Sequence, residues 1–155
     1  MGQEVAVFAV LSILFLGFGI YGLQKDDYYS SEISKYRNGI DDLNSRMVAA
    51  KTCSEALKVI EDTEKYLSKY GNVPQSIALE LDRLEAVLEG DCSNKDLATV
   101  KLEYYKNVFK PLYNLNEVPS RVSYLLREDH KWYPLSGIFL ALGITFLLIV
   151  IVALV

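Results

Sequence analysis

Two cysteines are the side chains of this 155-residue sequence whose spacing most directly suggests chemistry, because it suits a disulfide bond. Cys53 lies about 18 residues before Gly71, and Cys92 lies about 18 residues after Pro74. If a turn at 71–74 joins two antiparallel helices, both thiols reach its open end, within the ~5.5 Å Cα separation that a disulfide needs. Closing a loop of about 40 residues would stabilise the fold by on the order of 4 kcal/mol. Two separate buried thiols are the alternative.

No other set of residues has the spacing of a catalytic or metal site. The single histidine, His130, stands near Trp132 at a membrane entrance, where we expect its ring to meet headgroups or water. Arg127 occupies the position where di-metal bundles carry a glutamate. The acidic groups of Glu61–Glu64 and Asp82–Glu89 lack the glycine-containing pattern of calcium loops, so we expect them on solvated helix faces. The sequence therefore predicts no catalytic residue, no metal site and no cofactor.

A glycine pattern, Gly17-x-Gly19-x-x-Gly22, matches the fingerprint of dinucleotide-binding loops. It ends a long apolar run, with no preceding strand and no acidic residue at the place that binds a ribose, so we expect no nucleotide. Small residues also let another helix approach closely within a membrane. We expect that packing role for the three glycines, and for the small pair Gly137 and Ala141.

Two apolar segments without a charged residue, Val5–Leu23 and Pro134–Val155, bracket the chain. At ~1.5 Å per residue they would form helices of roughly 28 to 33 Å, about the thickness of a bilayer's hydrocarbon core. The first segment lacks the charged n-region of a signal peptide and is expected to remain as a permanent helix. Both segments are therefore predicted to span a membrane. The aromatic residues that suit its interfaces are Tyr21, Trp132 and Tyr133.

The polar stretch between these segments is predicted to fold as an all-α bundle, because its apolar residues recur at steps of three and four. Thr52 begins one predicted helix with a capping-box pattern, and the turn at 71–74 ends it. Whether the chain breaks near Lys51 stays open. Ser93 opens a further helix, which Pro111 is expected to end or kink.

The predicted organisation has three parts: a transmembrane helix at 1–24, an extramembrane helical domain at 25–131 with a 53–92 hairpin, and a second transmembrane helix at 132–155. The net charge of −4 and the absence of a basic block give a nucleic-acid backbone nothing to bind. The expected partners are the lipid bilayer and other membrane protein subunits, in a hetero- or homo-oligomer.

Two signals disagree about the side of the membrane on which the domain lies. A disulfide persists outside the reducing cytosol, which favours an extracytoplasmic domain with both termini in the cytoplasm. The basic residues next to the predicted spans favour the opposite orientation. That charge rule weakens for loops longer than about 60 residues, so we favour the extracytoplasmic placement in the cell membrane. The basic residues are Lys25, Lys35, Arg37, Arg127 and Lys131.

Eleven tyrosines indicate a surface for partners. Neighbouring residues on a helix point about 100° apart, so adjacent tyrosines cannot all face one core. Tyrosine is favoured at protein interfaces, although half-buried packing is the alternative. The candidate partner surface is Tyr28, Tyr29, Tyr104, Tyr105 and Tyr113.

Two classes of function agree with these features. The first is a non-catalytic structural or accessory subunit of a larger membrane assembly, with docking helices and an extracytoplasmic interaction domain. The second is an extracytoplasmic ligand-sensing module that signals through a separate partner, which rests on architecture alone. An enzyme is not expected.

Overall fold

The computed structural model describes residues 2–154, with every side chain in that range except those of Gly2 and His130. These residues are almost wholly helical and contain no strand, as the sequence pattern predicted. The helices are α1 (Gly2–Ala49), α2 (Cys53–Ser68), α3 (Gln75–Glu89), α4 (Asn94–Glu103), α5 (Lys110–Tyr113) and α6 (Ser120–Leu154), and a π-helix, η1 (Tyr104–Phe109), joins α4 to α5.

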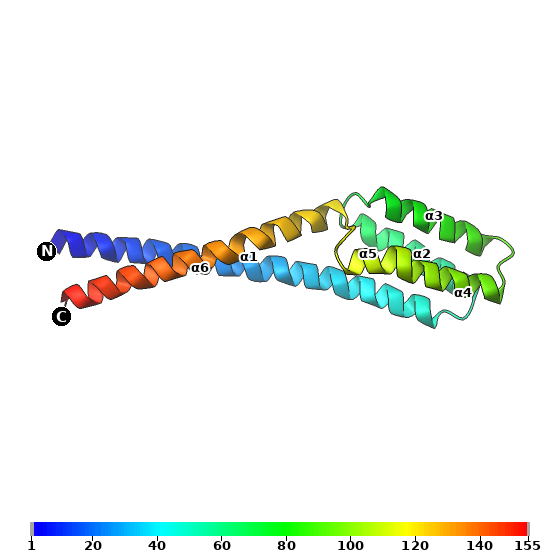
Figure 1. The fold of residues 1–155 in the computed structure, drawn as a ribbon, viewed down its shortest axis with the longest axis horizontal. Helices are drawn as coiled ribbons and strands as arrows, with labels where there is room; N and C mark the ends of the chain where they lie inside the picture. The colour runs from blue at the N-terminus through cyan, green and yellow to red at the C-terminus, as the bar shows by residue number, and fades with distance from the viewer. Residues whose placement is uncertain (1, 155) are drawn as a thin grey trace. The chain divides into compact units, whose positions relative to one another are not determined.

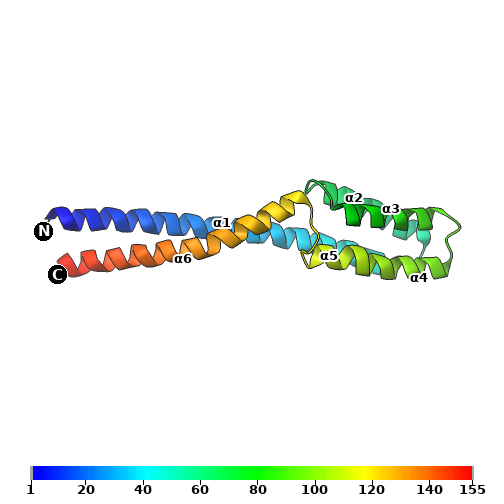
Figure 2. The same cartoon turned by 45° about the horizontal axis from the view of Figure 1, so that its top comes forward.

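The chain divides into two compact units, which we call the terminal helix pair (Met1–Glu32 with Leu125–Val155) and the bundle (Ile33–Tyr124). In the terminal helix pair, the first part of α1 and the later part of α6 lie side by side and antiparallel (Figures 1 and 2). The bundle contains the second part of α1, then α2, α3 and the continuous run α4–η1–α5. The domain boundaries predicted at 24/25 and 131/132 mark expected bilayer edges and stay a prediction.

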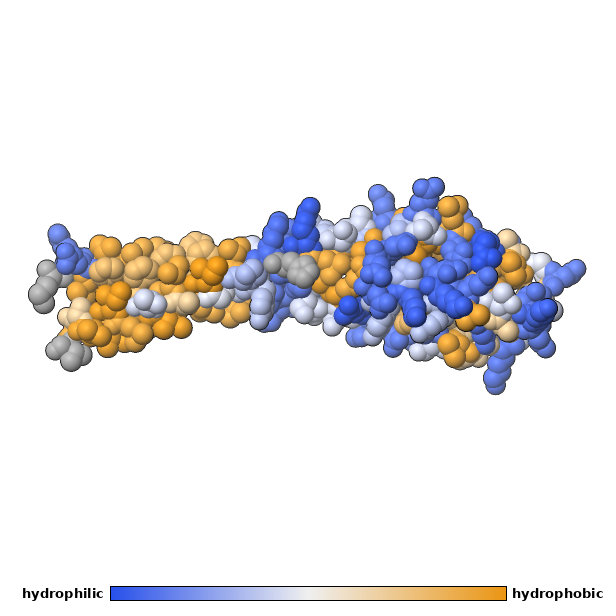
Figure 3. Space-filling model, viewed as in Figure 1, coloured by the Kyte–Doolittle hydropathy of each residue, from blue (hydrophilic) through white to orange (hydrophobic). Residues whose placement is uncertain are grey.

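Both helices of the terminal helix pair are long and apolar enough to cross a membrane. Their most apolar windows have mean hydropathies of 2.3 in α1 and 3.0 in α6. Only 17% of the α1 window and 6% of the α6 window is buried. The core helix of a water-soluble protein would be mostly buried. The pair instead presents an almost continuous apolar surface on the face seen in Figure 3.

Side-chain caps begin two helices of the bundle, α2 and α4, where the sequence predicted them. Thr52 accepts a hydrogen bond from the Glu55 N–H at 3.2 Å, and the Glu55 carboxylate accepts one from the Lys51 N–H at 2.6 Å. The chain therefore breaks between α1 and α2, the point that the sequence left open. At α4, Ser93 and Asp96 form a reciprocal capping box, which satisfies two backbone N–H groups that the helix leaves free.

The turn between α2 and α3 also binds the first residues of α6. Gly71 has a φ of +96°, a left-handed conformation that favours glycine. The Asn72 N–H donates to the Ser120 hydroxyl at 3.1 Å, and the Ser120 N–H donates to the Asn72 carbonyl at 3.0 Å. The Arg121 N–H donates to the Tyr70 carbonyl at 2.9 Å. These bonds fix the start of α6 on the bundle.

Pro111, which was expected to end or kink its helix, directly follows the π-helix η1 and lies in the short helix α5. The Lys110 N–H bonds the Tyr105 carbonyl five residues earlier, the spacing of a π-helix. Pro111 has no N–H for the carbonyl four residues before it, and its ring would crowd that carbonyl in an α-helix. The wider π-turn accommodates the proline, and α5 ends two residues later, at Tyr113.

Candidate functional site

Two leucine–glycine contacts hold the terminal helix pair together. A Cβ atom at Gly19 would lie 2.6 Å from Leu140 Cγ, and a Cβ atom at Gly143 would lie 2.7 Å from Leu16 Cγ. Each helix therefore places a leucine over a glycine of the other helix. On each helix, the leucine and the glycine are three residues apart. This close approach is the packing that small residues permit between membrane helices.

Polar and small residues continue the same contact along both helices. The buried Ser12 hydroxyl donates to the Gly143 carbonyl at 3.0 Å. A Cβ atom at Gly22 would lie 2.8 Å from the Ser136 Cβ. We call Ser12, Gly19, Gly22, Ser136 and Gly143 the glycine seam. Gly19 and Gly22 were expected to pack helices, whereas Gly143 was missed because it has no small residue four positions away to mark it.

A column of phenylalanines supplements this seam. Phe15 stacks on Phe139 and Phe146 with ring centroids 6.0 and 5.5 Å apart. Phe8 continues the column onto Phe146, and Phe18 continues it onto Phe139, at 5.8 and 5.9 Å. Aromatic pairs at these separations add about 0.5–1.5 kcal/mol each beyond area burial in water. The rings come from both helices and therefore fix the register of the pair.

The other predicted small residues face away from this contact. Among the described residues, nothing lies within 4 Å of a Cβ placed at Gly17 or Gly137. Ala141 is exposed as well. Around Gly17 lies an open apolar groove of about 360 Å³ on α1. We call it the Gly17 groove; it is lined by Ile13, Leu14, Gly17, Phe18 and Tyr21.

Two of the three predicted interface aromatics contact each other across the terminal helix pair. Tyr21 and Trp132 meet edge to face with ring centroids 5.7 Å apart, and Lys25 Nζ lies 5.5 Å from the Tyr21 centroid. Tyr133 is 72% exposed. An amphipathic belt of this kind suits the boundary between lipid and water.

The two cysteines are joined in the bundle, in agreement with the hairpin symmetry. Cys53 opens α2 and Cys92 follows α3, with their Cα atoms 6.3 Å apart. The bond ties the open end of the α2–α3 hairpin, opposite the turn at Gly71.

The five candidate partner tyrosines divide between core and surface. Tyr104 is 1% exposed, and its hydroxyl donates to Thr63 at 2.9 Å, while Thr63 donates to the Val59 carbonyl. Tyr29 is also buried. The exposed members are Tyr28, Tyr105 and Tyr113.

Tyr105 and Tyr113 belong to a row of rings along η1 and α5. Phe109 stacks on Tyr105 at 5.4 Å and lies 5.1 Å from Tyr113. Lys110 Nζ lies 5.6 Å from the Tyr105 centroid, and the Arg37 guanidinium lies 5.8 Å from that of Tyr113. We call these three rings and two cations the aromatic ridge.

A second group of tyrosines fixes α1 against α2 in the bundle. Tyr66 inserts its hydroxyl against Gly39 and donates it to the Tyr36 carbonyl at 3.2 Å. Tyr36 packs edge to face on Tyr70 at 5.1 Å. Burial raises the pKa of Tyr36 and of Tyr66 well above the usual value for a phenol. Among the described groups, the buried Tyr36 hydroxyl has no hydrogen-bond partner.

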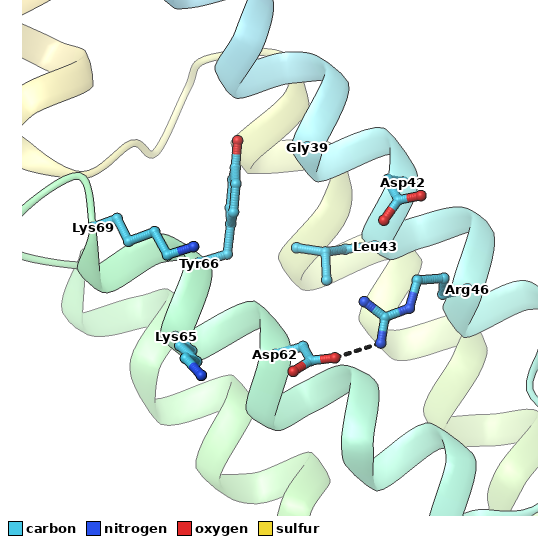
Figure 4. A pocket seen from close by; sticks show the side chains of 8 residues that line it. All are labelled: Gly39, Asp42, Leu43, Arg46, Asp62, Lys65, Tyr66 and Lys69. Atoms are coloured by element: carbon cyan, nitrogen blue, oxygen red, sulfur yellow. Dashed lines mark hydrogen bonds and ion pairs between the residues drawn. The ribbon is translucent and has the colours of Figure 1, made fainter.

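Next to Tyr66, α1 and α2 enclose an open pocket of about 310 Å³ (Figure 4). Leu43 forms part of its wall, and Arg46 pairs with Asp62 across it. The hydrogen bond from Arg46 lowers the pKa of Asp62. Lys65 and Lys69 complete a rim of mixed charge, on which no described side chain is arranged as a nucleophile with a general base.

Three of the acidic residues that were expected on solvated helix faces lie close to one another in the structure. Carboxylate oxygens of Glu64, Asp82 and Glu85 all lie within 4.8 Å of one another, and we call these three residues the acidic cluster. Burial and then the charges of Glu85 and Asp82 raise the pKa of Glu64. A second acidic pair, Asp26 and Asp129, lines a cavity of about 300 Å³ in the terminal helix pair.

No protein-family model, no curated protein sequence and no solved structure matches this chain. The assignment of a function therefore rests on the chemistry of the residues above. The His130 side chain, the sequence's one histidine, lies outside the described side chains.

Proposed function

We propose that this chain is a non-catalytic two-pass membrane protein that serves as a structural or accessory subunit of a larger membrane assembly. The observation that carries the proposal is the division of the glycines into two sets. Gly19 and Gly143 each pack against a leucine of the other helix of the pair. Gly17 instead lines an open apolar groove on α1.

The apolar surface of the terminal helix pair supports insertion into lipid. Side chains as large as Ile13, Phe18 and Ile144 are more than half exposed. In water this surface would cost about 25 cal/mol for every Å² left uncovered, whereas acyl chains cover it at no such cost. A helix pair with satisfied backbone hydrogen bonds and a small-residue seam meets the requirements of that environment.

The bridge between Cys53 and Cys92 supports an extracytoplasmic bundle, with both termini in the cytoplasm. The basic side chains beside the two apolar segments favour the reverse orientation. We give more weight to the disulfide, because the charge rule applies to short loops and the bundle is a long insertion.

The Gly17 groove is where we propose that a membrane helix of another subunit docks. An incoming helix would pack on Gly17 at short distance, as Leu140 packs on Gly19 within the chain. Gly17→Leu would fill the groove without touching the glycine seam. Ala6→Leu is the matched control, since it adds a leucine to an exposed position of the same helix.

Co-purification from gently solubilised membranes tests this function. The wild-type chain and Ala6→Leu should recover the same partner proteins in fixed ratio, and Gly17→Leu should lose them. Recovery of the wild-type chain alone, as a monomer, would count against a subunit role.

The pocket between α1 and α2 favours a second candidate, an extracytoplasmic sensing module. A small ligand that bound there would raise the melting temperature of the bundle, and Arg46→Ala would remove the shift. We rank this candidate lower because the two oppositely charged groups that face each other, Arg46 and Asp62, already pair.

A further inference from the structure

We propose that the bundle binds a second copy of itself, with the aromatic ridge of one chain on the acidic cluster of the next. The inference rests on the proposed function only in treating the bundle as a contact domain. It names the partner, a second copy of this chain, and the two surfaces that meet.

The charges of the bundle are divided unevenly among its helices. Helices α2 and α3 carry eight carboxylates against three basic side chains, whereas the run α4–η1–α5 carries four lysines against two carboxylates. The α2–α3 hairpin therefore has a net negative charge and the run α4–η1–α5 a net positive one. Surfaces of opposite sign on the same molecule attract each other between copies.

The aromatic ridge has the composition of a contact surface. Tyr105 and Tyr113 are each 39% exposed, and the Phe109 ring joins them. Among the described residues, no carboxylate lies within ion-pair distance of Arg37 or Lys110, although both cations are exposed. Tyrosine and arginine are enriched at interfaces, where rings supply area and cations supply direction.

The acidic cluster lacks a described cation as a partner. Three carboxylates within 4.8 Å of one another repel, and no described cation pairs with Glu64, Asp82 or Glu85. A lysine from outside would relieve that repulsion. Within the chain, Arg37 and Lys110 lie over the rings of Tyr113 and Tyr105, and neither is among the described cations that pair with a carboxylate.

This contact is heterologous, because different surfaces of the two copies meet. Each chain keeps a free ridge and a free cluster after binding once. Association therefore continues to a closed ring or a row of chains rather than stopping at a symmetric dimer.

Charge reversal of the full-length chain in neutral lipid vesicles tests the proposal. Variant R carries Arg37→Glu with Lys110→Glu, and variant C carries Glu64→Lys with Glu85→Lys. The matched control reverses two other exposed lysines, with Lys51→Glu and Lys95→Glu. A zero-length carbodiimide links contacting lysines to carboxylates, and mixed isotope labels identify links between chains.

Links from Lys110 of one chain to Glu64 or Glu85 of another are expected for the wild type and the control. Because each reversal also removes a group that the carbodiimide links, association of the variants is measured by fluorescence energy transfer between labelled chains. Either reversal should weaken this association about tenfold, the effect of roughly 1.4 kcal/mol. Mixing variants R and C should restore it, because each then meets a surface of opposite sign. Circular dichroism checks that both variants are folded.

Three results would overturn the inference: a monomeric wild type, unchanged association in R and C, or no recovery of association on mixing. Association that is lost in Gly17→Leu and unaffected by R and C would also overturn it. That last result would leave the proposed subunit role intact.

Discussion

Leu140 occupies the space that a side chain at Gly19 would need, at 2.6 Å from the position of the missing Cβ. Leu16 has the same relationship to Gly143. This reciprocal contact distinguishes the glycines that pack within the terminal helix pair from those whose Cβ would meet no described atom within 4 Å, and the two sets should respond differently to mutation.

Leucine at Gly19 or Gly143 should separate the two helices of the terminal helix pair. The new side chain would clash with the facing leucine, which cannot move without breaking the contacts of the glycine seam. Leucine at Gly17 or Gly137 should leave the pair closed. Trp132 is the sole tryptophan and touches Tyr21, so its fluorescence in vesicles reports the separation. A red-shifted emission is expected for the first two variants alone. Equal spectra for all four would contradict the assigned seam.

Reduction of the disulfide should destabilise the bundle strongly. The bond closes a loop of 39 residues, for which the lost entropy of the unfolded chain corresponds to about 4 kcal/mol. Denaturant unfolding of Cys53→Ser with Cys92→Ser, compared with the wild type with and without reductant, measures the effect. Reductant should lower the free energy of unfolding of the wild type to that of the double variant. It should leave the free energy of unfolding of the double variant unchanged.

Alanine at Gly39 should lower the stability of the bundle by about 1–3 kcal/mol, because its Cβ would meet the Tyr66 hydroxyl. The loss is expected although alanine favours helices over glycine. Gly90→Ala is the control: its Cβ would have nothing closer than 3.7 Å. Replacing Tyr66 by leucine in the Gly39→Ala background should recover part of the loss, as seen in chemical denaturation.

Alkaline pH should unfold the bundle through its buried tyrosines. Burial raises the pKa of Tyr104 to about 12. The folded chain holds this proton more tightly than the unfolded chain, whose tyrosines titrate near ~10. Stability is therefore full below about pH 10 and falls as the pH rises towards 12. Tyr104→Phe should flatten this fall in denaturation curves, whereas the exposed Tyr28→Phe should not.

Much of the fold could be predicted because it depends on local pattern. The recurrence of apolar residues predicted the helices, the side chains of Thr52 and Ser93 predicted where two of them begin, and equal arm lengths predicted the meeting of Cys53 and Cys92. Each of these signals lies within a short stretch of chain or follows from simple helix geometry.

The orientation of helices about their axes could not be predicted in this way. The spacing of Gly17 and Gly19 shows that they lie on different faces of α1, but only the partner helix decides which face is covered. For the same reason the sequence left open whether Tyr104 belongs to the partner surface, whereas in the structure it bonds to Thr63 in the core. The acidic cluster brings together residues of α2 and α3 whose relative register depends on the packed hairpin.

The most direct test of a two-pass protein with a bridged extracytoplasmic bundle is thiol labelling in intact cells. A membrane-impermeant maleimide should label Cys53 and Cys92 only after treatment with a membrane-impermeant reductant, and the chain should stay in the carbonate-washed membrane fraction. Labelling without reductant after cell lysis, or release of the chain by carbonate, would contradict the account.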